Sequence, residues 1–196
     1  MENQPRTYQL PQALAAINED TLRLGFDMPS ELNTCQLLKT LAASKPNGRL
    51  LEVGTGTGLS TAWLLMGMDH QSTLISLDSD SEVQQIARNH LGQDPRVDFI
   101  CTDGELWLND NQDQTFDMIF ADAWPGKFAQ LDKALNLLAL GGIYIIDDLL
   151  PQANWPEGHA PKVPALMEAI EAKKQFTSVR MSWASGLMLV TRVSLD

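Results

Sequence analysis

The chain has 196 residues, 44% of them hydrophobic, a size that suits one globular domain rather than two. Its formal net charge of −11 gives a surface that repels nucleic-acid phosphates. No run approaches the roughly 20 apolar residues of a membrane helix, and the N-terminus lacks the pattern of a secretion signal. We therefore expect a cytoplasmic protein without nucleic-acid or membrane partners. Cys35 and Cys101 are interpreted as buried free thiols, which suits a reducing compartment.

Two helices are predicted before the first strand. The stretch 9–24 predicts one of them, and the second opens after Pro29-Ser30. The second is marked by an apolar stripe at helical spacing: Leu32, Cys35, Leu38 and Leu41.

Five short apolar runs then predict five strands. They begin at Leu50, Leu74, Val97, Phe116 and Ile143, at intervals of 19 to 27 residues. This rhythm is typical of strands alternating with crossover helices, and continuous apolar runs favour parallel strands covered on both faces.

Helices are predicted between these strands. The segment Ser79–Glu82 predicts a capping box at the start of one helix. A later helix is predicted by an apolar stripe and the glycine pair that stops it: Phe128, Leu131, Leu135, Leu138 and Gly141-Gly142. After the last helix, the alternating segments 176–183 and 187–193 flank the turn Ala184-Ser-Gly186 and predict a closing antiparallel hairpin.

A glycine-rich loop follows the first predicted strand, in the segment Leu50-Leu-Glu-Val-Gly-Thr-Gly-Thr-Gly58. Such a loop lets the backbone approach a ligand, while the next helix offers amide donors. The spacing Gly54-x-Gly56-x-Gly58 differs from the dinucleotide pattern G-x-G-x-x-G, and no nucleoside-triphosphate loop is present. Glu52 lies in the strand, two residues before the first glycine.

Two aspartates end the next strands. Asp78 ends the second strand, where a carboxylate can accept hydrogen bonds from both hydroxyls of a ribose. Asp103, followed by Gly104, ends the third strand, where it can accept from the amino group of an adenine. Each aspartate can instead cap the helix that follows it.

Five segments in this order and spacing carry a family resemblance: LLEVGTGTGLSTAWLL, ISLDSD, CTDGELWL, FDMIFADAW and GGIYIIDD. They resemble the class I S-adenosylmethionine-dependent methyltransferases, and more narrowly the catechol and caffeoyl-CoA type O-methyltransferases, over residues 28–193. The resemblance implies an α/β, Rossmann-like, doubly wound fold. Its seven-stranded, mostly parallel sheet would have the order 3-2-1-4-5-7-6 and end in the antiparallel hairpin.

The resemblance also implies one methyltransferase domain over residues 1–196. Its parts would be N-terminal helices at 1–45, a cofactor-binding core at 49–148, a substrate lid at 149–164, and the last helix and hairpin at 165–196. Relatives often dimerise through N-terminal helices, so a homodimer is a further expectation.

Cofactor-binding roles follow from the same resemblance. Glu52 would lie near the methionine amino group, and Asp78 would hold the ribose beside Ser79. Asp103 and Gly104 would flank the adenine. The remaining residues implied to surround the cofactor are Gly54, Thr55, Gly56, Thr57, Gly58 and Asp122. Met28 and Ser30 either close over the methionine end or form only a loop and a helix cap.

Three carboxylates end the fourth and fifth strands: Asp122, Asp147 and Asp148. Parallel strand ends converge on one crevice, and three carboxylates suit Mg²⁺ or Ca²⁺. The resemblance implies that such a metal binds and activates the hydroxyl to be methylated. Alternatively, Asp122 faces the cofactor or substrate while Asp147 and Asp148 cap the next segment.

The chain departs from the family pattern near these carboxylates. The family has Asp-Asn where this chain has Asp147-Asp148, and its catalytic lysine corresponds to Pro125. Lys127 is then a candidate catalytic residue together with Asp122, or it is a solvated surface lysine. The same choice applies to His159, which is either a base or an incidental loop residue, while Trp124 and Trp155 either wall the substrate pocket or pack in the core.

We therefore predict an S-adenosylmethionine-dependent methyltransferase that acts on a small molecule, with oxygen as the favoured acceptor and with or without a divalent metal. Two alternatives stay open. One is a metal-independent methyltransferase acting on a carboxylate or amine, and the other is a non-catalytic domain that binds S-adenosylmethionine.

Overall fold

The computed structural model describes residues 10–195, in which strands alternate with helices over most of the length. The elements in chain order are α1 (Leu10–Leu24), α2 (Leu32–Ala43), β1 (Arg49–Val53), α3 (Leu59–Gly67), β2 (Thr73–Asp78), α4 (Ser81–Leu91), β3 (Val97–Cys101), α5 (Gly104–Asp110), β4 (Phe116–Ala121), α6 (Leu131–Asn136), β5 (Leu138–Ile146), α7 (Lys162–Glu171), β6 (Phe176–Met181) and β7 (Leu187–Arg192). Gln9, the first residue of the predicted N-terminal helix, lies outside the described residues. None of the helices in this part of the chain has the length and apolar character that crossing a membrane requires.

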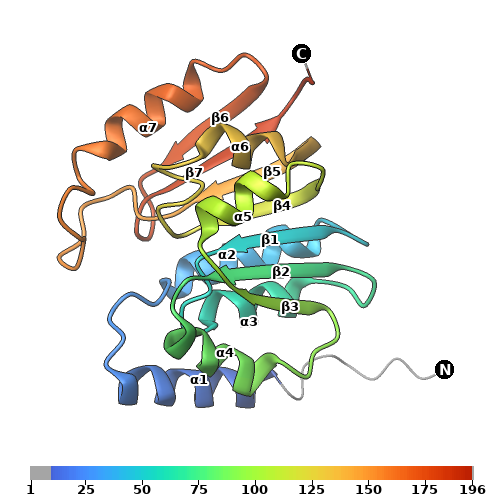
Figure 1. Cartoon of the computed structure of the whole chain (residues 1–196), viewed down its shortest axis with the longest axis vertical. Coiled ribbons are helices and arrows are strands. Elements are labelled where there is room, and N and C mark those ends of the chain that lie inside the picture. Colours follow the sequence, from blue (N-terminus) through green and yellow to red (C-terminus); the bar gives the residue numbers. More distant parts are fainter. Residues whose placement is uncertain (1–9, 196) are drawn as a thin grey trace.

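All seven strands join one sheet in the order β3-β2-β1-β4-β5-β7-β6 (Figure 1). The five strands from β3 to β5 are parallel, while β7 runs antiparallel to both β5 and β6. The predicted doubly wound sheet, its strand order and its closing hairpin are therefore confirmed.

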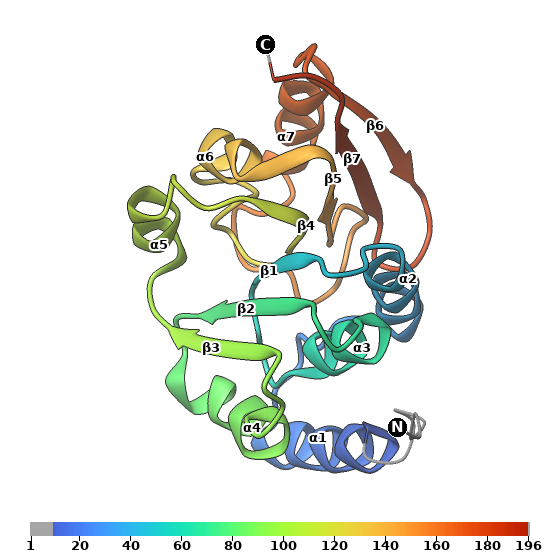
Figure 2. The same ribbon diagram turned by 90° about the vertical axis from the view of Figure 1, so that its right-hand side faces the viewer.

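Helices cover both faces of this sheet. Figure 2 shows α5, α6 and α7 on one face and α2 and α3 on the other, with α1 and α4 towards the β3 edge. Each face has its own hydrophobic core, and successive residues of β1 alternate between them, because side chains along a strand point to opposite faces. Leu51 and Val53 belong to the core beneath α5–α7, whereas Leu50 packs towards α2 and α3. This double burial explains why the strands read as continuous apolar runs.

The first helix, α1, packs against α4 and α3. Ile17 is fully buried in the core on that face. The Thr21 hydroxyl donates to Thr57 Oγ1 at 2.7 Å, and Asp20 Oδ2 lies 2.7 Å from His90 Nε2. The N-terminal helix is thereby fixed both to the segment that follows β1 and to α4.

Three local expectations are wrong. Helix α4 is capped by Asp80 instead of the predicted Ser79, because the Asp80 carboxylate accepts from Glu82 N and Val83 N at 2.9 and 3.1 Å. The helix expected to continue to Leu138 ends at Asn136. Leu138 pairs with Phe116 and so begins β5 five residues before the predicted strand start.

The third wrong expectation concerns the cysteines. Cys35 is buried in α2, but Cys101 is exposed, because it ends β3 at the edge of the sheet.

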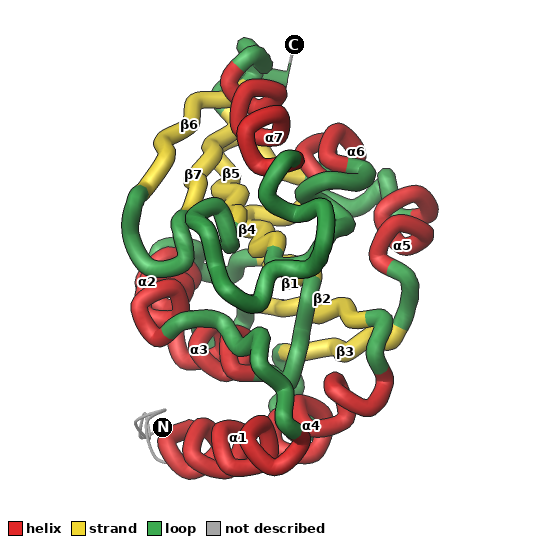
Figure 3. Tube along the Cα trace, turned by 90° about the vertical axis from the view of Figure 1, so that its left-hand side faces the viewer, coloured by secondary structure: helices red, strands yellow, loops and turns green. Residues whose placement is uncertain are grey.

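Two connecting segments meet at the carboxyl end of the parallel strands. The α1–α2 loop and the β5–α7 loop (residues 147–161) lie at the end of the sheet that faces the viewer in Figure 3. Asn154 in the second loop donates its side-chain amide hydrogen to Asp27 O in the first, at 2.7 Å. The two loops together form a roof over this end of the sheet.

Candidate active site

A cleft of about 380 Å³ opens where β1, β2, β4 and β5 end. Its walls come from the glycine loop after β1, the ends of the other three strands and the two loops that form the roof. Parallel strands bring their carboxyl ends to one edge of a sheet, so segments far apart in sequence meet here. One cleft thus joins the glycine loop to the carboxylates at the ends of β4 and β5.

The glycine loop is fixed by hydrogen bonds to the end of β2. Gly54 and Gly56 line the cleft and have positive φ angles of +105° and +53°. The amide of Gly56 donates to Asp78 Oδ2 at 2.8 Å, and Asp78 Oδ1 accepts from Asp80 N at 2.9 Å. Asp78 is therefore oriented by backbone amides on both sides while it lines the cleft.

The two threonines of the loop also line the cleft, but their hydroxyls bond within the protein. Thr55 Oγ1 lies 2.7 Å from Ser76 Oγ and accepts from Gln84 Nε2 at 3.0 Å. Thr57 Oγ1 accepts the hydroxyl hydrogen of Thr21. These contacts tie the loop to β2, α4 and α1.

Glu52 lies beneath the loop and does not line the cleft. Its side chain is fully buried and accepts hydroxyl hydrogens from Ser60 at 2.6 Å, Thr61 at 2.5 Å and Ser76 at 2.6 Å. Burial raises the pKa of the Glu52 carboxyl to about 7, although the three hydroxyls favour its charged form. Because Ser60 lines the cleft, Glu52 reaches the cleft through that hydroxyl.

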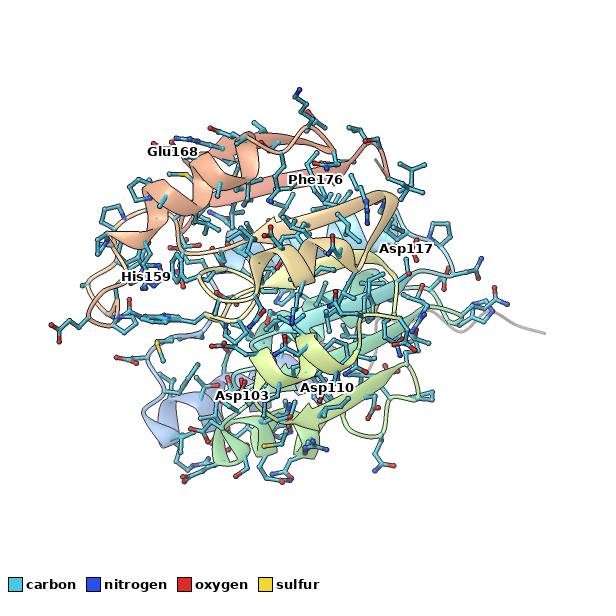
Figure 4. All side chains as sticks on the ribbon, turned by 45° about the horizontal axis from the view of Figure 1, so that its top comes forward. Asp103, Asp110, Asp117, His159, Glu168 and Phe176 are labelled. Carbon is cyan, nitrogen blue, oxygen red and sulfur yellow. The ribbon has the colours of Figure 1, made fainter. Side chains whose placement is uncertain are left out.

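Besides Glu52, four predicted cofactor residues stand outside the cleft lining: Gly58, Ser79, Asp103 and Gly104. A Cβ at Gly58 would lie 2.6 Å from that of Ala87, so this glycine permits close packing against α4. Asp103 caps α5, because its Oδ1 accepts from Glu105 N at 2.7 Å and from Leu106 N at 3.2 Å. Figure 4 labels Asp103 beside α5, away from His159.

At the other end of the cleft, all three predicted carboxylates are present. Asp122 Oδ2 accepts from the Ser30 hydroxyl at 2.9 Å, which brings the α1–α2 loop onto the end of β4. Asp147 Oδ1 accepts from the Ser185 hydroxyl and from the amide of Asp148, the latter at 2.8 Å. Asp148 has a left-handed backbone with φ of +61°.

These carboxylates lie close together, Asp147 buried and Asp122 and Asp148 half-buried, and this environment shifts the pKa values of Asp122 and Asp147. Burial raises the pKa of Asp122 well above its usual range, and the nearby charges of Asp147 and Asp148 raise it further. Burial also raises the pKa of Asp147, to about 6. Lys127 acts in the opposite direction on both groups.

Lys127 reaches the centre of this group. Its side chain is 2% exposed, and its ammonium donates to Asp147 O at 3.1 Å. Nζ also lies 4.0 Å from Asp122 Oδ1 and 3.9 Å from Asp148 Oδ2. The interpretation of Lys127 as a solvated surface residue is therefore wrong.

Aromatic rings complete the wall. Trp124 and Trp155 both line the cleft, so neither is purely a core residue. The ring of His159 stacks on Trp155 with centroids 4.2 Å apart and meets the edge of Phe128 at 4.8 Å. Nε2 of His159 lies 3.0 Å from Asp148 O and must carry the hydrogen, since a carbonyl only accepts. Burial lowers the pKa of His159.

Known proteins resemble the chain over most of its length. The model of the methyltransferase-domain family matches residues 51–149. A protein of Mycolicibacterium smegmatis that carries the name O-methyltransferase is 30% identical over 166 residues, covering 80% of this chain and 79% of its own. The chain belongs to the methyltransferase family.

Further relatives agree with this assignment. A protein of Dictyostelium discoideum named as a caffeoyl-CoA O-methyltransferase is 26% identical over 182 residues, covering 85% of this methyltransferase and 79% of its own length. The O-methyltransferase of Bacillus cereus, solved in complex with S-adenosylhomocysteine, has the same fold, with a TM-score of 0.82 at 19% identity. It covers 92% of this chain and 90% of its own. The predicted class I methyltransferase family is confirmed, and the relatives include proteins named as O-methyltransferases, one of them of the caffeoyl-CoA type.

The carboxylates of this methyltransferase do not fit the divalent metal that the family resemblance implies. Within residues 10–195, no three acidic, histidine or cysteine side chains are grouped as metal ligands. Asp147 is turned towards Ser185, and Asp122 and Asp148 face an ammonium group. Divalent cations require several oxygens at about 2.0–2.6 Å, and a lysine holds the central position here.

Sequence reasoning missed two features of the methyltransferase site. Ser185 was assigned only to the turn before β7, yet it is 4% exposed and holds Asp147. Phe26 lines the cleft and packs under Gly56, where a Cβ would meet its ring at 3.4 Å. A turn serine and a loop phenylalanine carry no periodic signal, so only the folded arrangement reveals them.

Proposed function

We propose that this methyltransferase transfers the methyl group of S-adenosylmethionine to an oxygen of a small molecule. The observation that carries the proposal is the single cleft, which has the glycine loop and Asp78 at one end and Asp122 and Lys127 at the other. A transfer reaction needs both partners in one enclosed space, with the reacting atoms in line.

The cofactor end offers the groups that this ligand requires. Gly54 and Gly56 allow the backbone to approach the methionine portion, and Asp78 can accept from both ribose hydroxyls. Thr55 and Thr57 complete the part of the glycine loop that lines the cleft, and Ser60 links Glu52 to the methionine end. When bound, S-adenosylmethionine supplies an electrophilic methyl group on a sulfonium.

The adenine is proposed to lie at the open edge of the cleft. Thr102 N donates to Asp78 O at 2.8 Å, which places Asp103 and Gly104 next to the end of β2. Because both amides that Asp103 caps bond to Oδ1, we propose that Oδ2 accepts from the adenine amino group, with Ser79 and Gly58 supporting the loop from outside the cleft.

At the acceptor end, Asp122 and Lys127 are the proposed catalytic residues. In the proposed transfer, a lone pair of the acceptor oxygen would form the new bond to the methyl carbon while the carbon–sulfur bond of the cofactor breaks and leaves its electron pair on sulfur. The hydroxyl proton passes to the Asp122 carboxylate, whose raised pKa makes it a stronger base. The Lys127 ammonium faces the same space and stabilises negative charge that develops on the oxygen.

The domain plan keeps its predicted form in this proposal. Residues 49–148 serve as the cofactor-binding core and 149–164 as the substrate lid, although α7 already begins at Lys162 within that lid.

A homodimer through the N-terminal helices is supported by Leu22 and Leu32, which are 82% and 59% exposed. A cytoplasmic location is supported by the two free cysteines.

Calorimetric titration with S-adenosylhomocysteine tests the proposal. The wild type is expected to bind it, and Asp78→Ala to lose about 100-fold in affinity through the missing ribose hydrogen bonds. Asp98→Ala on the exposed side of the neighbouring edge strand is the matched control and should bind like the wild type.

Release of S-adenosylhomocysteine is then followed with a panel of small hydroxyl compounds. Cofactor binding without release on any acceptor would favour the non-catalytic alternative, and no binding at all would reject the proposal.

A further inference from the structure

The position of Lys127 has a consequence for how the acceptor site is charged. Its ammonium faces oxygens from Asp122 at the end of β4 and from Asp147 and Asp148 after β5. Only 2% of the Lys127 side chain is exposed, so its charge is balanced mainly by these oxygens and not by water. Removing either sign of charge from such a buried group leaves the other uncompensated, which makes the cation an integral part of the site.

The loop between β4 and α6 directs this lysine inwards. Lys127 N donates to Trp124 O at 3.1 Å, and Gly126 N donates to Ala129 O at 2.8 Å, which together close a tight turn. Gly126 has a φ of +83°, and a Cβ there would lie 2.6 Å from the hydroxyl of Tyr144. Pro125 replaces the lysine that the family has at this position. In addition, the turn at Gly126 directs the Lys127 side chain towards Asp122, Asp147 and Asp148, here called the carboxylate cluster.

We propose that the Lys127 ammonium takes the place of the divalent metal, so that this methyltransferase carries its own cation and transfers methyl groups without a bound metal ion. Methyl transfer without a metal ion rests on the proposed function. The replacement of a metal ion by the Lys127 ammonium does not. A dication brought among these carboxylates would lie close to a fixed ammonium, and the repulsion between the two cations weakens the attraction that the carboxylates exert on the dication.

Removal of the ammonium should uncover a metal site. In Lys127→Ala the three carboxylates lose their cation and a space opens between them, and hard oxygen ligands around such a space bind a divalent ion. In Lys127→Met the charge is lost but most of the volume stays filled, so binding should be weaker than in Lys127→Ala. Lys162→Ala is the matched control, because Lys162 lies against Trp124 at the same cleft, 5.2 Å from its ring centroid, and has no carboxylate of the cluster as a partner.

The experiment titrates chelator-stripped protein with Mn²⁺ alone and follows free Mn²⁺ by electron paramagnetic resonance. Lys127→Ala is expected to bind one Mn²⁺ about 100-fold more tightly than the wild type or Lys162→Ala. Addition of Asp148→Asn to Lys127→Ala should abolish that binding and so locate it.

Two results would overturn the proposal: stoichiometric Mn²⁺ binding by the wild type that Asp148→Asn removes, or a folded Lys127→Ala that binds no better than the wild type. The wild-type result decides even when Lys127→Ala does not fold, because a metal site in the unaltered cluster contradicts the proposal directly.

A second measurement addresses the reaction. Metal-depleted wild type, checked by elemental analysis, should keep its full transfer rate in EDTA, and loss of the rate that Mn²⁺ restores would contradict the proposal. Titration with S-adenosylhomocysteine on the same preparation separates the two hypotheses. If that ligand does not bind, the proposed function fails while the Mn²⁺ result still decides the role of Lys127.

Discussion

The two ends of the cleft hold their carboxylates in different ways. At the glycine-loop end, Glu52 is surrounded by three hydroxyls and Asp78 by backbone amides, so neutral donors hold each carboxylate. At the other end, Asp122 and Asp148 face a lysine that is itself buried. The first arrangement fixes the glycine loop in a conformation that can bind a ligand. The second places carboxylates that can exchange a proton, and the Lys127 ammonium, where a reaction can use them.

The largest effect is expected from Lys127→Met, which should alter only the reactive end. Loss of the ammonium is expected to lower kcat/KM by about 100- to 1000-fold and to leave S-adenosylhomocysteine affinity unchanged. Lys127 lowers the pKa of Asp122, so the variant should raise that pKa further. Because the base must be ionised, the rise of rate with pH should move to higher pH. A loss of rate with an unmoved pH profile would contradict this role.

Glu52→Gln, at the cofactor end, should change the pH dependence of protein stability, whereas Lys127→Met changes the rate of the reaction. The folded pKa of about 7 exceeds the ordinary value of 4.5, so Glu52 favours the fold below pH 4.5 and that contribution disappears as pH rises through 7. The loss corresponds to about 3 kcal/mol. The free energy of unfolding is measured with urea at about pH 5 and at about pH 8. Its change between the two pH values should be smaller in Glu52→Gln than in the wild type by about this amount. Equal pH dependence in both proteins would exclude this account.

A pair of glycine substitutions can separate packing from ligand contact within the loop. Gly58→Ala should lower the free energy of unfolding by about 3 kcal/mol, because its φ is +93° and the new methyl would strike Ala87. Gly56→Ala has more room, with only the Phe26 ring at 3.4 Å, and should chiefly weaken S-adenosylhomocysteine binding. Chemical unfolding and ligand titration of both variants measure this, and a reversed order would refute the assignment.

The smallest effects concern Asp103, whose two roles can be separated. Asp103→Ser keeps a cap for α5 and removes the carboxylate, so stability should hold while S-adenosylhomocysteine affinity falls about tenfold. Asp103→Ala should lose that affinity and also about 1 kcal/mol of stability. If Asp103→Ser binds normally, Asp103 is a helix cap and nothing more.

The same contrast explains what could be predicted from sequence. The sheet order and the glycine loop follow from local patterns, since each strand is a continuous apolar run and Gly54, Gly56 and Asp78 lie at fixed positions after strands. The sequence also placed Asp122, Asp147 and Asp148 together, because parallel strand ends converge.

The detail of the reactive end could not be predicted in this way. Whether Lys127 points inwards depends on a turn whose conformation is decided by Gly126 and Tyr144, two residues from different elements. The cap at Asp80 and the end of α6 were missed for a related reason. A competing carboxylate in one case, and pairing of Leu138 with β4 in the other, outweighed the local pattern.

The hydrogen bond from Asn154 to Asp27 O joins segments 127 residues apart, and it is exposed. A single exposed bond of this kind is worth about 1 kcal/mol, an amount that thermal motion supplies many times during one turnover. This bond between the two loops of the roof can therefore break and re-form while the sheet below stays intact. Because Asn154 itself lines the cleft, breaking this hydrogen bond is expected to widen the passage through which the acceptor enters and the products leave.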